Sequence, residues 1–89
     1  MRESKIEEKL RLGVEAKGGE CFKWVSPNRS GVPDHIVVLP GAIVFVETKA
    51  PLGELKPWQE RCHARLRELG FDVEVLWTMG MVHEFLCSL

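Results

Sequence analysis

The stretch GVPDHIVVLPGAIVFVETKAP, residues 31–51, decides the fold of this chain. Two runs rich in β-branched residues, 35–39 and 42–49, flank a Pro-Gly pair, which is typical of antiparallel strands joined by a tight turn. Pairing the strands about the centre of that turn places Asp34 opposite Glu47. The segment therefore predicts a β-hairpin with two carboxyl side chains at its open end.

The open end of the hairpin also carries a lysine. On a strand, residues i and i+2 share a face, so Glu47 and Lys49 point the same way and Thr48 points opposite. Two carboxylates side by side repel each other unless a cation lies between them. Magnesium prefers oxygen ligands, and one or two carboxylates are its usual protein ligands. Asp34 and Glu47 are therefore a candidate metal site, although a simple salt bridge to Lys49 fits the same spacing.

Lys49 has two candidate roles. A divalent cation makes a bound water acidic enough to act as a nucleophile at neutral pH. An ammonium group beside it could orient that water or stabilise the charge that builds on phosphorus. The spacing alone leaves open whether Lys49 neutralises the acids or takes part in catalysis.

The rest of the chain adds a helix and a strand before the hairpin and a helix, a strand and a helix after it. Apolar residues recur every three to four positions in the helical stretches, and β-branched residues dominate the extended ones. The order α-β-β-β-α-β-α predicts one α/β domain over residues 1–89, with a mixed β-sheet flanked by helices. The predicted helices are 3–17, 57–69 and a closing one capped by Thr78, and the predicted strands are 21–25, 35–39, 42–49 and 71–77.

The apolar faces of the predicted helices indicate which residues form the core. Ile6, Leu10 and Val14 form one face of the first helix, and Trp58, Cys62, Leu66 and Leu69 form one face of the second. The tryptophans Trp24, Trp58 and Trp77 are expected in the core. His63 and His83 lie in ordinary helical contexts and are assigned no metal role.

Composition excludes several classes of protein. The chain has 89 residues, a net charge of -1 and a 45% hydrophobic fraction, which is ordinary for a soluble globular domain. Three cysteines at wide spacing, without a CxxC pair, indicate neither a zinc site nor a redox pair and fit a reducing cytoplasm. No apolar stretch approaches the ~20 residues of a membrane helix, so no membrane association is expected.

The motifs GVPD and, downstream, ETK resemble the signature of PD-(D/E)xK nucleases. The wider pattern IEEKL…GG…K…GVPDHIVV…FVETKAP…Q…LGFDVEV resembles the VRR-NUC domain family from Glu3 to about Leu86. The resemblance implies a restriction-endonuclease-like core and an endonuclease that cleaves DNA with Mg²⁺ or Mn²⁺.

The resemblance also implies a biological setting. Standalone relatives of phage or bacterial type act in repair, recombination or replication on branched DNA such as Holliday junctions. It implies a homodimer in the cytoplasm of a bacterial or phage-infected cell. The alternative is a nucleic-acid-binding module that keeps the fold without catalysis.

The resemblance assigns roles to the hairpin and to the helix that follows it. Asp34 and Glu47 would bind the metal, with the backbone carbonyl of Thr48 as a further ligand. Lys49 would be the catalytic lysine. Gln59, in the first turn of the second helix, would hydrogen-bond water or a carboxylate in the site.

The resemblance further implies a glutamate on the first helix. Glu7 fits that position best, and Glu3 and Glu8 are the alternatives, Glu3 because it lies one turn away on the same helix face. His35 stands where many relatives have arginine. Strand alternation predicts that His35 points away from Asp34, so it is assigned no catalytic role.

Three polar residues precede Asp34 and are candidates for contacts with DNA phosphates. They are Lys23, Arg29 and Ser30, of which Arg29 is the best single candidate. A loop whose charges only face solvent is the alternative.

Overall fold

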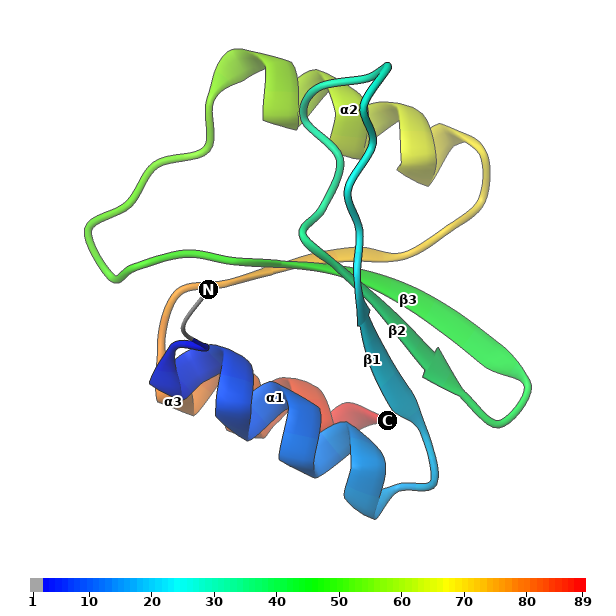
Figure 1. Cartoon of the computed structure of the whole chain (residues 1–89), viewed down its shortest axis with the longest axis vertical. Coiled ribbons are helices and arrows are strands. Elements are labelled where there is room, and N and C mark those ends of the chain that lie inside the picture. The colour runs from blue at the N-terminus through cyan, green and yellow to red at the C-terminus, as the bar shows by residue number, and fades with distance from the viewer. Residues whose placement is uncertain (1–2) are drawn as a thin grey trace.

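The computed structural model describes residues 3–89 and shows a four-stranded sheet with helices on both sides (Figure 1). The predicted order α-β-β-β-α-β-α and the mixed sheet are confirmed, and no element end differs from the predicted one by more than two residues. The elements are α1 (Lys5–Ala16), β1 (Glu20–Lys23), β2 (His35–Leu39), β3 (Ala42–Thr48), α2 (Pro57–Glu68), β4 (Val73–Leu76) and α3 (Met79–Ser88).

The sheet has the strand order β1-β2-β3-β4, so β3 is central. Strands β1, β2 and β3 pair antiparallel, and β3 pairs with β4 in parallel. A parallel pair needs a crossover connection, which α2 supplies between β3 and β4. The turn that joins β2 to β3 has Gly41 at a φ of 75°, a conformation that glycine adopts without steric cost.

Helices α1 and α3 lie side by side against one face of the sheet, and α2 lies on the other side (Figure 1). The core forms between the sheet and the α1–α3 pair. Alternate residues of β2 and β3 point into it, because successive side chains of a strand face opposite sides. The buried members of this core are Leu10, Val14, Val37, Val44, Val46, Leu76, Val82 and Phe85.

The predicted apolar stripe of α2 is only partly correct. Trp58 is 47% exposed and Leu69 is 55% exposed, whereas Cys62 is buried as predicted. The residue that α2 buries most deeply is His63, at 1% exposure. Helix α2 lies over the end of the sheet that carries Glu47, where the facing side chains are polar as well as apolar.

Trp24 and Trp77 are half-buried but lie outside the buried core, so the expectation that the tryptophans belong to the core is met only in part. Trp24 lies 5.2 Å from Phe45, ring centre to ring centre, and the Trp77 indole N–H donates to the carbonyl of Gly53. All three cysteines are free thiols. Among residues 3–89, no helix combines the length and apolarity that a membrane span requires.

Candidate functional site

The hairpin brings Asp34 and Glu47 to the same end of the sheet. His35 pairs with Val46, so Asp34 and Glu47 are the next residues outward on β2 and β3. The loop before Asp34 passes directly under α2 at Gly31, which has a φ of 89°. A Cβ atom on Gly31 would lie 2.4 Å from the carbonyl oxygen of Trp58. Glycine at this position therefore lets the loop approach α2 closely enough to place Asp34.

Asp34 is fixed by the strand that it faces. Its Oδ1 accepts the backbone N–H of Thr48 at 3.1 Å, and its Oδ2 accepts the Thr48 hydroxyl at 3.0 Å. The Nδ1 atom of His35 lies 2.7 Å from Asp34 Oδ1. The prediction that His35 points away from Asp34 is therefore wrong. Asp34 lies beyond the last β2–β3 pair and turns its carboxylate toward Thr48, which shares the His35 face of the sheet.

Glu7 reaches the same place from α1. One oxygen accepts the backbone N–H of Ser4 at 3.0 Å and so completes the capping box that begins the helix. The other oxygen lies 3.2 Å from His35 Nε2 and pairs with Lys23. Burial by itself would raise the pKa of Glu7, but the hydrogen bonds from Lys23 and Ser4 outweigh it and lower that pKa. Glu7 is therefore held as a carboxylate.

The two alternative glutamates of α1 lie elsewhere. Glu3 accepts two hydrogen bonds from the guanidinium of Arg11. Glu8 is exposed. Of the three candidates, Glu7 is the one that the structure brings to Asp34.

Glu47 is the most buried acid of the site, at 5% exposure. Its Oε2 lies 3.9 Å from Lys49 Nζ, and its Oε1 lies 3.6 Å from His63 Nε2. Burial, and next the negative charge of Asp34, raise the pKa of Glu47 to about 7. The expected repulsion between the carboxylates of Asp34 and Glu47 is therefore present. The positive charge of Lys49 offsets it only in part.

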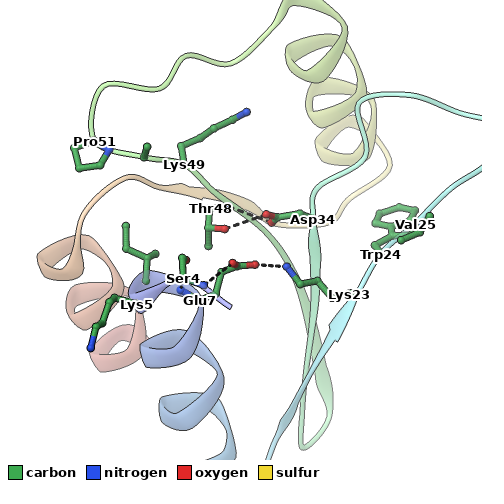
Figure 2. A pocket seen from close by; sticks show the side chains of 12 residues that line it. Ser4, Lys5, Glu7, Lys23, Trp24, Val25, Asp34, Thr48, Lys49 and Pro51 are labelled. Carbon is green, nitrogen blue, oxygen red and sulfur yellow. Dashed lines mark hydrogen bonds and ion pairs between the residues drawn. The ribbon is translucent and has the colours of Figure 1, made fainter. Parts of the chain in front are cut away.

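Lys49 extends from the end of β3 toward α2, away from Glu7 (Figure 2). Its ammonium group donates to Gln59 Oε1 at 3.1 Å. The same oxygen of Gln59 accepts the backbone N–H of Lys56 at 2.9 Å, at the start of α2. Gln59 therefore ties the lysine to the helix that covers this end of the sheet.

Glu7, Asp34, Thr48 and Lys49 line a cleft of about 670 Å³, whereas Glu47 lies behind its lining. Figure 2 shows Glu7 and Asp34 turned toward each other across its floor, with Thr48 beside them. Lys23 and Lys49 stand on opposite sides of the two acids. Trp24, Val25, Ala50 and Pro51 form much of the rim.

The three residues suggested for phosphate contacts do not lie together. Lys23 lines the cleft and pairs with Glu7. Arg29 lines a second cavity of about 240 Å³, which it shares with Trp24 and Arg65. Ser30 is exposed on the loop between β1 and β2.

The donor atoms gathered at this end of the sheet fit a divalent cation. One ligand atom each from Glu7, Asp34 and His35 lies within 4.8 Å of the others, and Glu47 stands at the adjacent pair position. Hard cations such as Mg²⁺ take carboxylate oxygens, and an imidazole nitrogen also suits manganese and later transition metals. A cation would offset the burial and the repulsion by Asp34 that together raise the pKa of Glu47. Thr48 contacts Asp34 through its N–H and hydroxyl, and a ligand role for its carbonyl stays a prediction.

Two histidines of the site were missed in the sequence. Strand alternation points His35 to the correct face, but it does not reveal that Asp34 turns onto that face. His63 carries a usable signal, because it lies four residues after Gln59 and so shares its helix face. That spacing could have placed His63 beside the hairpin.

Comparisons with known proteins agree with this architecture. A family model described as "VRR-NUC domain" matches residues 2–79. A protein of Acyrthosiphon pisum secondary endosymbiont phage 1 named "Putative nuclease p44" is 52% identical over 77 residues, which are 85% of this chain and 83% of that protein. A solved structure described as a VRR_NUC domain superposes with a TM-score of 0.87 at 35% identity, over 93% of this chain and 91% of the other.

Proposed function

The chain belongs to the VRR-NUC domain family, and on that premise we propose that residues 1–89 form one nuclease domain that hydrolyses phosphodiester bonds of DNA with Mg²⁺ or Mn²⁺. One observation carries the proposal. The hairpin register sets Asp34 and Glu47 at neighbouring strand ends, with Lys49 on the Glu47 face and Glu7 facing Asp34. Fold alone would not imply chemistry, but this set of side chains supplies what metal-assisted hydrolysis needs.

In this proposal each side chain has a separate task. Asp34 and Glu47, with Glu7 and the Thr48 carbonyl beside them, hold the cation, which when bound activates water and neutralises charge on the phosphate. Lys49 orients the attacking water or stabilises the charge that develops on phosphorus. Gln59 holds the Lys49 ammonium in place.

DNA would approach the open side of the cleft. Lys23 stands at its mouth, and Arg29 and Ser30 lie on the exposed β1–β2 loop, where they would contact phosphates. We propose branched DNA, such as a four-way junction, as the substrate and a homodimer as the active form, because two-fold symmetry presents two cleavage sites to a two-fold substrate. The phage origin of a 52% identical relative supports action in the cytoplasm of a bacterial or phage-infected cell.

The proposal is tested with purified protein on a labelled plasmid and a four-way junction. We expect cleavage with Mn²⁺ or Mg²⁺ and none in EDTA. Glu47→Ala and Lys49→Ala should each lower the cleavage rate on the order of 10²–10³-fold. Glu84→Ala, an exposed glutamate on α3, is the matched control and should cleave at the wild-type rate.

The other outcomes decide between the alternatives. Binding of DNA without cleavage under any divalent ion would show a nucleic-acid-binding module instead. If Lys49→Ala cleaves at the wild-type rate while Glu47→Ala is inactive, Lys49 is only the salt-bridge partner of the acids.

A further inference from the structure

Helix α2 and strand β3 contact each other through two pairs of polar side chains. Gln59 contacts Lys49, and His63 faces Glu47. Four residues of a helix span about 6 Å along its axis, and two residues of a strand span about 6.7 Å. One turn of α2 is thus matched in length to the Glu-x-Lys unit at the end of β3. The two helix residues stand directly over the two strand residues.

The contact between His63 and Glu47 is incomplete as it stands. The distance from His63 Nε2 to Glu47 Oε1 is 3.6 Å, slightly longer than a hydrogen bond. Among residues 3–89, the buried side-chain nitrogen and oxygen atoms without a hydrogen-bond partner are both ring nitrogens of His63 and this oxygen of Glu47. Leaving a buried polar atom unpaired is costly, so such atoms call for an explanation.

The two oxygens of Glu47 have different neighbours. Oε2 faces Lys49 at 3.9 Å, and Oε1 faces His63. Burial, and next the charges of Arg67 and Lys49, lower the pKa of His63. A neutral imidazole has one N–H to donate. A donor on Oε1 would fix the carboxylate plane and leave Oε2 free on the side of Lys49.

We propose that His63 is the positioning residue for Glu47, donating Nε2–H to Oε1 in the metal-loaded protein. This role rests on the proposed function, because it takes Glu47 as a ligand of the cation. Residues that hydrogen-bond to a metal ligand without touching the metal set the orientation of that ligand, and their loss commonly weakens metal binding 10–100-fold. His63 touches neither the cation nor DNA in this arrangement, so it acts through Glu47.

The test measures Mn²⁺ binding to the full chain by calorimetry for four variants. His63→Gln places an amide N–H near the position of Nε2, whereas His63→Asn reaches only as far as Nδ1. We expect His63→Leu and His63→Asn to weaken Mn²⁺ binding about 10-fold or more, and His63→Gln to stay within about 3-fold of wild type. His83→Leu, on the exposed face of α3, is the control and should bind like wild type.

Thermal unfolding of the metal-free protein separates positioning from packing. His63→Leu removes two unpaired buried nitrogens, so its midpoint should equal or exceed that of wild type while its Mn²⁺ affinity falls. Equal Mn²⁺ affinity for the Gln and Asn variants would overturn the proposal, and that pair decides even if His63→Leu does not fold. A wild-type protein that binds no Mn²⁺ would instead refute the proposed function itself.

Discussion

At the scale of single residues, Glu47 gives the metal-free protein an unusual dependence on pH. Its pKa rises from 4.5 to about 7 on folding, chiefly through burial. Below pH 4.5 the carboxyl is protonated in both states, and its contribution to stability is fully present. That contribution is lost as the pH rises through about 7, because the folded protein must then ionise a buried acid beside Asp34.

We therefore expect Glu47→Gln to stabilise the metal-free protein at pH 8 but not at pH 5. The shift in pKa sets an upper limit of about 3 kcal/mol on the gain. Thermal unfolding in EDTA at the two pH values measures it, with Glu84→Gln as the exposed control. Equal effects of Glu47→Gln at both pH values would mean that Glu47 titrates normally in the folded chain.

The sequence predicts some residues of the site well, and the reasons are physical. Strand alternation and the turn fix Asp34 opposite Glu47 and set Lys49 on the Glu47 face. The contacts of His35 and His63 depend on side-chain directions and on how α2 sits over the sheet, which no local pattern encodes. Trp58 is expected to be buried and is exposed. An apolar stripe on a helix leads to burial only where a second element covers the stripe.

At the scale of elements, the packing of the 26–33 loop against α2 depends on Gly31. Alanine there would have an unfavourable positive φ and a Cβ atom 2.4 Å from the Trp58 carbonyl oxygen. Gly41 also has a positive φ, but a Cβ atom there would meet nothing within 4 Å. Gly41→Ala is thus a matched control that carries the backbone cost without the clash.

We expect Gly41→Ala to lower the free energy of unfolding by about 1–2 kcal/mol. Gly31→Ala should cost clearly more, about 3 kcal/mol or above, because α2 or the loop must also shift. Urea denaturation of the two variants measures the difference. Equal losses would show that the loop can move away from α2 without penalty, and that Gly31 does not set the position of Asp34.

At the scale of the whole molecule, the sheet face that lies on the α2 side is only partly covered. Phe22 and Ile43 are 46% and 47% exposed, and Phe71 beside Phe45 is 46% exposed. Large apolar side chains left in contact with water on one sheet face are candidates for contacts between proteins. It is the surface on which the proposed homodimer would form.

We expect wild-type protein to have about twice the chain mass of 10.1 kDa in solution. Phe22→Lys should lower that mass to one chain, because it sets a charge within the proposed contact. Leu12→Lys, at an exposed apolar position of α1, is the control and should leave the mass unchanged. Light scattering coupled to gel filtration measures all three, and a monomeric wild type would contradict the dimer.

The element order and the mixed sheet flanked by helices follow from hydrophobic periodicity and from the short Pro-Gly turn. The exposure of one sheet face cannot be predicted in this way, because Phe22 and Ile43 have the same apolar character as core residues. The sequence shows which side chains are apolar. Only the arrangement of the helices over the sheet shows which of these apolar side chains remain exposed to water.

Glu7 both caps helix α1 and lines the cleft, so the stability of the helix end and ligand binding in the cleft depend on each other. One carboxylate oxygen begins α1 by accepting the N–H of Ser4, and the other faces His35 and Lys23 in the cleft. If the first turn of α1 unfolded locally, Glu7 would leave the wall of the cleft, so a ligand that contacts Glu7 would stabilise that turn. Ligand binding at the site should therefore slow local unfolding of this helix end. Slower hydrogen exchange of the Glu7 amide in the presence of ligand would measure this coupling.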